Sequence, residues 1–132
     1  MRCLVFGGEG LLGRALAREA RRRGDAVLAL PLEVADIERP GELLAWAGEF
    51  RPTAIVNAAA LTRVDDCEGS AATAMAVNGT AVAHVAAAAA AVGARLVQIS
   101  TDYVFDGAAR APYPEDAPTG PRTAYGASKL AG

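Results

Sequence analysis

The sequence predicts an α/β fold built on a doubly wound parallel sheet. Two observations support this prediction. Short, continuous apolar runs alternate along the chain with longer segments of helical period, and no repeat or linker interrupts the 132 residues. Short apolar runs without polar alternation are typical of strands buried on both faces, and strands that alternate with helices form parallel sheets. The length corresponds to one domain.

The first elements are clearly delimited. Residues 2–6 form an apolar run that ends at glycine, which predicts a buried strand. Residues 11–23 carry apolar side chains at a helical period, with five arginines on the other side, so we expect a helix that Gly24 ends. Residues 26–30 predict a second strand.

The middle of the chain continues the alternation. Residues 43–50 suggest a short helix and residues 54–57 a third strand. An Ala-rich segment, residues 70–92, predicts a long helix that ends at Gly93, and residues 95–100 predict another strand.

The last third is less regular. Residues 106–122 are rich in Gly, Pro, Asp and Glu without a period, so we expect a loop. A final helix is predicted to begin near Thr123.

Composition excludes several classes of protein. With 52% hydrophobic and 21% charged residues the chain is neither disordered nor a coiled coil, although 32 of its residues are Ala. The net charge of −2 argues against binding to nucleic acid or to a membrane surface, so we interpret the arginines of residues 11–23 as a solvated helix face. The longest apolar run, residues 85–92, is too short to cross a bilayer.

The cysteines, the N-terminal segment and the single histidine indicate the compartment and argue against a metal site. Cys3 and Cys67 are far apart and form no CxxC pair, which favours a reduced cytoplasmic compartment. The N-terminal segment reaches glycine too early for a signal peptide. A lone histidine, His84, predicts no metal site.

Three glycines, Gly7, Gly10 and Gly13, stand between the first strand and the first helix. In a dinucleotide-binding loop the first glycine allows the tight turn, the second lets the backbone approach a pyrophosphate, and the third lets the helix pack on the strand. The free N–H groups at the helix N-terminus then favour the phosphates. We therefore predict a dinucleotide site here.

The identity of the dinucleotide stays open between NADPH and NADH. The ribose is usually read by an acid or an arginine near the end of the second strand. That strand is followed here by Pro31 and Leu32, with Glu33 beyond them. Asp36 is an acid that could contact the adenine, and a plain polar loop residue is the alternative interpretation.

Tyr125 and Lys129 are four residues apart, so on a helix they share one face. Lys129 is the one lysine among 13 basic residues. A free phenol titrates near pH ~10, and a nearby ammonium stabilises the phenolate, which makes such a pair suited to proton transfer. Ser100 and Thr101 end the preceding strand and add hydroxyls at the carboxyl edge of the sheet.

These motifs resemble the extended short-chain dehydrogenase/reductase superfamily and, within it, the dTDP-4-dehydrorhamnose reductase family. The resemblance runs along the whole chain, through residues 7–13, 56–60, 77–80, 99–107 and 125–132. It implies a Rossmann-like fold, a nicotinamide cofactor and a nucleotide-sugar ketone as substrate. Residues 99–107 argue against an epimerase or dehydratase of the same superfamily, which is the alternative enzyme.

The resemblance also implies roles for individual residues. Tyr125 would donate a proton to the keto oxygen, Thr101 would orient the sugar, and Lys129 would tune Tyr125 and hold the nicotinamide ribose. The residues implied to line the cofactor are Gly7, Gly10, Leu11, Leu12, Gly13, Asp36, Ala58, Ala59, Ala60, Asn78, Tyr125 and Lys129.

The length of the family leads to a further expectation. Its members have roughly twice as many residues, and Gly132 falls inside the expected catalytic helix. We therefore expect residues 1–132 to be a C-terminally truncated NAD(P)-binding domain without the substrate domain. A non-catalytic nucleotide-binding module is the third alternative. A homo-oligomer would be one way to cover the open edge of such a partial sheet.

Overall fold

The computed structural model describes residues 1–132 as two compact units. The first unit comprises residues 1–60 and 81–99, and the second comprises residues 61–80 and 100–132.

The first unit contains a four-stranded, wholly parallel sheet. Its strands are β1 (Arg2–Phe6), β2 (Ala26–Leu30), β3 (Ala54–Asn57) and β4 (Arg95–Gln98), in the spatial order β2-β1-β3-β4. In the register, Val5 of β1 pairs with Ala29 of β2 and with Val56 of β3. The order confirms the predicted Rossmann-like α/β fold.

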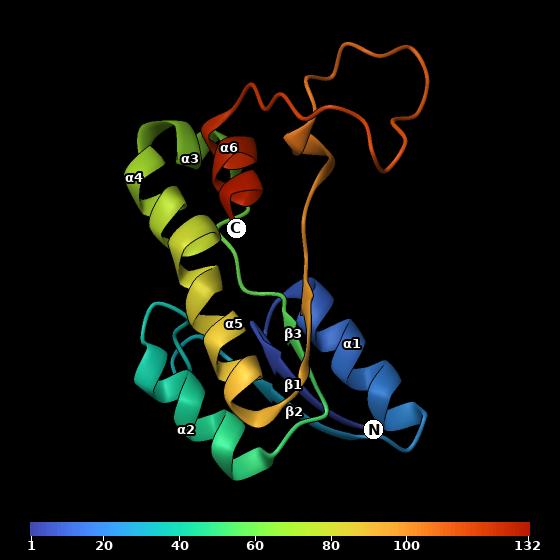
Figure 1. The fold of residues 1–132 in the computed structure, drawn as a ribbon, viewed down its shortest axis with the longest axis vertical. Helices are drawn as coiled ribbons and strands as arrows, with labels where there is room; N and C mark the ends of the chain where they lie inside the picture. Colours follow the sequence, from blue (N-terminus) through green and yellow to red (C-terminus); the bar gives the residue numbers. More distant parts are fainter. The chain divides into compact units, whose positions relative to one another are not determined.

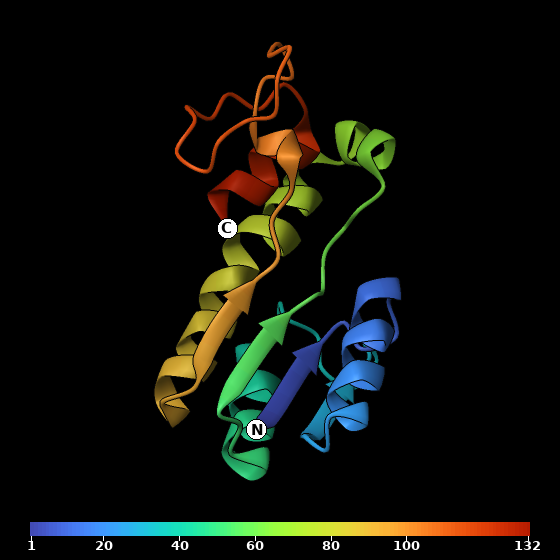
Figure 2. The same ribbon diagram turned by 90° about the vertical axis from the view of Figure 1, so that its right-hand side faces the viewer.

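Helices cover both faces of this sheet (Figures 1 and 2). Helix α1 (Leu11–Arg22) contacts β1 and β2, whereas α5 (Ala81–Val92) packs on β3, β4 and α2 (Pro40–Phe50). The core lies between these layers and contains β1 and β3 residues together with small helix residues. Alanines such as Ala17, Ala47 and Ala88 are fully buried, which lets the helices approach the sheet closely.

The second unit is built from short helical segments. It contains α3 (Val64–Gly69), α4 (Ala71–Ala74), the π-helical turn η1 (Met75–Thr80), the 3₁₀ turn η2 (Asp102–Val104) and α6 (Ala124–Ala131). Helix α6 packs on the other four segments. Thr123 caps α6 by accepting a hydrogen bond from the Gly126 N–H, at 3.0 Å.

The structure differs from the predicted elements in five places. Helix α2 begins at Pro40 rather than at residue 43, because proline is favoured in the first helical turn. The expected helix over residues 70–92 contains the π-helical turn η1, and β4 ends at Gln98 rather than at residue 100. Neither α3 nor η2 was predicted.

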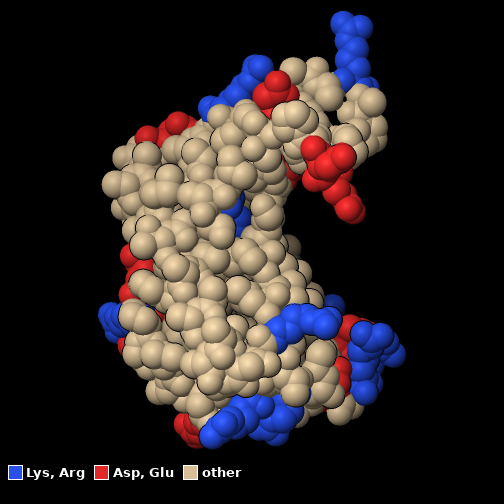
Figure 3. Space-filling view, in the orientation of Figure 1, with Lys and Arg blue, Asp and Glu red and all other residues tan.

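The helical residues Ala71–Val92 are long and apolar enough to cross a membrane by length and composition alone. The core helix of a soluble protein passes the same test. Val82, Val85, Ala88 and Ala89 of α5 are buried, and α5 packs on the sheet and α2. This packing favours a core helix. In Figure 3 most of the visible face carries no charged side chains, and basic and acidic side chains lie mainly along its margins.

Candidate functional site

The glycine loop after β1 approaches the loop after β3 very closely. Gly7 has a φ of +77°, a backbone conformation that residues other than glycine rarely adopt. A Cβ placed there would lie 2.6 Å from the Ala59 nitrogen and 2.8 Å from the Ala58 carbonyl carbon. Gly7 is therefore required for both the turn and the approach of these two loops.

Two more glycines are fixed by backbone contacts. A Cβ at Gly13 would collide with the Gly7 carbonyl oxygen, so α1 can start close to β1 only with glycine at this position. A Cβ at Gly8 would lie 2.6 Å from the carbonyl carbon of Ala29 in β2. Gly8 was not predicted to matter. The pair of adjacent glycines at positions 7 and 8 is the sequence feature that could have indicated this close contact.

The N-terminus of α1 has the character of an anion site. Its N-cap residue is Gly10, and no side chain caps the first turn. The N–H groups of that turn have no carbonyl partner within the helix. A Cβ at Gly10 would meet only the Gly7 carbonyl oxygen, at 3.3 Å. Leu11 is 86% exposed, so the turn is accessible, and these features fit a bound pyrophosphate.

Asn57, at the end of β3, shapes the loop that faces Gly7. Its buried side chain donates to Gln98 Oε1 at 2.8 Å and accepts from the Ala59 N–H at 3.2 Å. The Ala58 N–H in turn donates to the Phe6 carbonyl at 3.0 Å. Ala58, Ala59 and Ala60 are partly exposed and lie in the same unit as the glycine loop.

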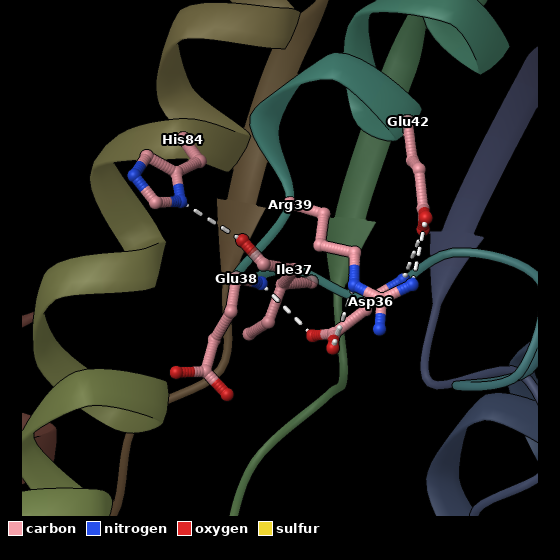
Figure 4. Close-up of polar contacts among 6 residues, drawn as sticks. All are labelled: Asp36, Ile37, Glu38, Arg39, Glu42 and His84. Carbon is pink, nitrogen blue, oxygen red and sulfur yellow. Dashed lines mark hydrogen bonds and ion pairs between the residues drawn. The ribbon is translucent and has the colours of Figure 1, made fainter.

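Asp36 belongs to a hydrogen-bonded loop after β2 (Figure 4). Its Oδ1 accepts from the Glu38 N–H at 3.0 Å, and its own N–H donates to Glu42 Oε2 at 3.1 Å. Arg39 bonds to Glu42 at 3.1 Å and lies 3.8 Å from Asp36 Oδ2. Bonding to the Asp36 N–H and to Arg39 lowers the pKa of the Glu42 carboxyl. The carboxylate of Asp36 is thus held in place, and its contact with adenine stays a prediction.

In the second unit, the turn η2 lies directly against the start of α6. A Cβ at Gly126 would collide with the Tyr103 carbonyl oxygen, so this close contact requires glycine. The rings of Tyr103 and Tyr125 meet edge to face with centroids 5.6 Å apart. Thr101 is the N-cap of the turn, and its Oγ1 accepts from the Tyr103 N–H at 3.3 Å. Thr101 and Tyr125 therefore come from two elements that touch.

Lys129 is one turn after Tyr125 on α6 and is 6% exposed. Burial lowers the pKa of its ammonium from the usual value. A buried lysine carries a large desolvation cost, and such groups concentrate at functional sites.

Asn78 connects the loop after β3 to α6. Its Oδ1 accepts from the Leu61 N–H at 2.9 Å, and its Nδ2 donates to the Leu61 carbonyl at 3.0 Å and to Ser128 Oγ at 3.1 Å. Ser128 donates to the Tyr125 carbonyl at 2.8 Å. Because these bonds engage both polar atoms of the Asn78 side chain, it holds α6 in place, while its predicted contact with the cofactor is untested.

The predicted residues therefore separate into two groups. The first unit holds Gly7, Gly10, Leu11, Leu12, Gly13, Asp36 and Ala58–Ala60, and the second holds Asn78, Thr101, Tyr125 and Lys129. Sequence reasoning missed Ser128 as a positioning residue. It also missed Glu68, whose Oε1 accepts from the Ala124 N–H at 2.7 Å.

A family model described as the RmlD substrate binding domain matches residues 1–132. A curated dTDP-4-dehydrorhamnose reductase from Streptomyces griseus is 51% identical over 131 residues. The chain belongs to the dTDP-4-dehydrorhamnose reductase (RmlD) family. This match confirms the family predicted from the sequence. It covers 99% of this chain and 43% of the Streptomyces protein, so the chain spans less than half the length of that relative.

Two solved structures with bound dinucleotide have a closely similar fold. The dTDP-4-dehydrorhamnose reductase of Bacillus anthracis, in complex with NADP, is 35% identical with a TM-score of 0.94, over 98% of this chain and 46% of that one. The Bordetella bronchiseptica enzyme WbmG, in complex with NAD and UDP, is 29% identical with a TM-score of 0.82, over 99% of this chain and 47% of that one. Structural relatives of the chain therefore bind NADP or NAD.

Proposed function

We propose that residues 1–132 are the NAD(P)H-binding portion of a reductase that converts the 4-ketone of a nucleotide sugar, dTDP-4-dehydrorhamnose, to the alcohol. The observation that carries this proposal is the contact of η2 with α6 in a member of this family. It supports a site in which Thr101, Tyr125 and the buried Lys129 act together. The residues that bind most of the sugar would lie in the part of the family that this chain does not span.

The first unit would hold the cofactor. The uncapped first turn of α1 would donate N–H groups to the pyrophosphate, and the close approach of Gly7 to Ala59 would keep the two loops beside it in place. When bound, the reduced nicotinamide supplies a hydride to the keto carbon.

The second unit would supply the proton. The Tyr125 hydroxyl would donate its proton to the keto oxygen, and the Lys129 ammonium would stabilise the phenolate that is left. The Thr101 hydroxyl would donate a hydrogen bond to the same oxygen and orient the sugar. Asn78 and Ser128 would hold the start of α6, where Tyr125 lies, in a fixed position.

A fusion protein tests this proposal. Residues 1–132 joined to the remaining portion of the Streptomyces griseus relative should reduce dTDP-4-dehydrorhamnose with NADH or NADPH, detected as dTDP-rhamnose by chromatography. Tyr125→Phe should lower kcat at least about 100-fold, the contribution expected of a general acid, and leave cofactor binding within about threefold. Full activity of Tyr125→Phe would refute the assignment of the proton donor.

The same assay separates the alternatives. An epimerase would change the sugar without net oxidation of the cofactor, and a non-catalytic module would bind cofactor without any product. We expect the 132-residue chain alone to bind the cofactor and to form little or no product. Brisk reduction by that chain would show that the portion it does not span is dispensable.

A further inference from the structure

Glu9 is the one charged residue of the glycine loop, and its side chain reaches the end of β2. Its Oε1 accepts a hydrogen bond from the Leu32 N–H at 3.3 Å. The backbone beside it is fixed, because the Gly8 N–H donates to the Leu30 carbonyl at 2.8 Å. The carboxylate is exposed, and its Oε2 has no hydrogen-bond partner in the structure.

In dinucleotide-binding folds of this type, the end of the second strand is where the adenosine ribose is read. A carboxylate there accepts a hydrogen bond from the ribose 2′-hydroxyl of NAD, whereas a basic side chain accommodates the 2′-phosphate of NADP. Sequence reasoning sought this carboxylate after β2 and found no clear candidate. The structure supplies one from the glycine loop, 23 residues earlier than Leu32.

The charges around Glu9 also favour a cofactor without a 2′-phosphate. No lysine or arginine occurs between Arg23 and Arg39. Arg39 is engaged by Glu42 and Asp36 (Figure 4). A 2′-phosphate near Glu9 would therefore meet a like charge, and the one basic residue between β2 and α2, Arg39, is already paired with Glu42 and Asp36.

We propose that Glu9 determines which cofactor binds. Its carboxylate would accept a hydrogen bond from the ribose 2′-hydroxyl of NADH and repel the 2′-phosphate of NADPH, so that this chain prefers NADH. This inference rests on the proposed function, because it concerns the same cofactor site.

Binding measurements on the 132-residue chain test the inference without any turnover. Titration calorimetry with NADH and NADPH should show tighter binding of NADH by about tenfold or more, the size of one partly screened like-charge interaction. 5′-AMP and adenosine 2′,5′-bisphosphate, which carry only the adenosine half and differ only in the 2′-phosphate, should show the same order. Glu9→Gln keeps an oxygen that can accept from the Leu32 N–H and removes only the charge. It should tighten NADPH about tenfold and change NADH by less than about threefold.

The control variant is Glu49→Gln. Glu49 lies exposed in α2 and makes no ion pair. Glu49→Gln therefore changes the net charge by the same amount as Glu9→Gln. It should leave the NADPH-to-NADH affinity ratio unchanged.

Different results would refute the cofactor site and the role of Glu9. If the chain binds neither dinucleotide, the proposed function fails. If it binds both but prefers NADPH, or if Glu9→Gln shifts the ratio no more than Glu49→Gln, the cofactor site stands and the role of Glu9 is refuted.

Discussion

The Asn78 side chain is the buried polar group whose removal should most disturb the second unit. It is 1% exposed and makes three hydrogen bonds, two to the Leu61 backbone and one to Ser128. Each hydrogen bond contributes about 0.5–1.5 kcal/mol net. Leu61 is 38% exposed, so water can replace part of what its backbone loses. We therefore expect Asn78→Ala to lower the free energy of unfolding by about 2–3 kcal/mol.

Urea unfolding monitored by circular dichroism measures the total loss, and hydrogen exchange of the α6 amides locates it. Protection of α6 should fall more than protection of β1. Asn78→Asp keeps an acceptor for the Leu61 N–H but places a carboxylate oxygen against the Leu61 carbonyl. It should be at least as unstable as Asn78→Ala at pH 7, and partly recover in acid, where the protonated carboxyl can donate.

Ser128→Ala completes a double-mutant cycle with Asn78→Ala. Ser128 is fully buried between Asn78 and the Tyr125 carbonyl, so the two losses should be coupled by about 0.5–1.5 kcal/mol. A loss below about 0.5 kcal/mol for Asn78→Ala, with unchanged α6 exchange, would refute the positioning role.

Three further outcomes are expected. Gly13→Ala should destabilise the chain by about 1–3 kcal/mol in urea, because its Cβ collides with backbone. Gly48→Ala, at an exposed position of α2 where a Cβ meets nothing within 4 Å, should instead stabilise the chain by about 0.5–1 kcal/mol. Burial lowers the pKa of the Lys129 ammonium, so unfolding takes up a proton between its folded pKa and 10.5, and stability should rise with pH there. Lys129→Met should lose that alkaline rise and should be inactive in the fusion. Tyr113→Phe removes a 2.6 Å hydrogen bond to Asp106, so the pKa of that carboxyl, which the bond lowers, should rise toward 3.8 when titrated by NMR.

The first unit could be predicted well because its signals are local. The strands β1, β2 and β3 are short apolar runs that end at glycine, proline or asparagine, and the structure places each one at the predicted residues. The glycine spacing likewise located the tight turn at Gly7 and the close packing at Gly13.

The second unit was harder to predict because its elements depend on tertiary contacts. In α3, Cys67 is the one buried residue, so the segment has no apolar period to detect. The π-helical turn carries Asn78 toward Leu61 and Ser128, and such a bulge has no local sequence signature within an Ala-rich helix. The carboxylate of Glu9 was missed for a similar reason, because its contact with Leu32 joins two loops that are separate in sequence.

Deuterium transfer is the most direct test of the proposed reductase chemistry. The fusion protein would be incubated with dTDP-4-dehydrorhamnose and NADH deuterated at the transferable position, and the product analysed by mass spectrometry and NMR. The account predicts one deuterium at C4 of the sugar and its loss in Tyr125→Phe, with dinucleotide binding retained. Product without deuterium, or labelled product formed at an unchanged rate by Tyr125→Phe, would contradict it.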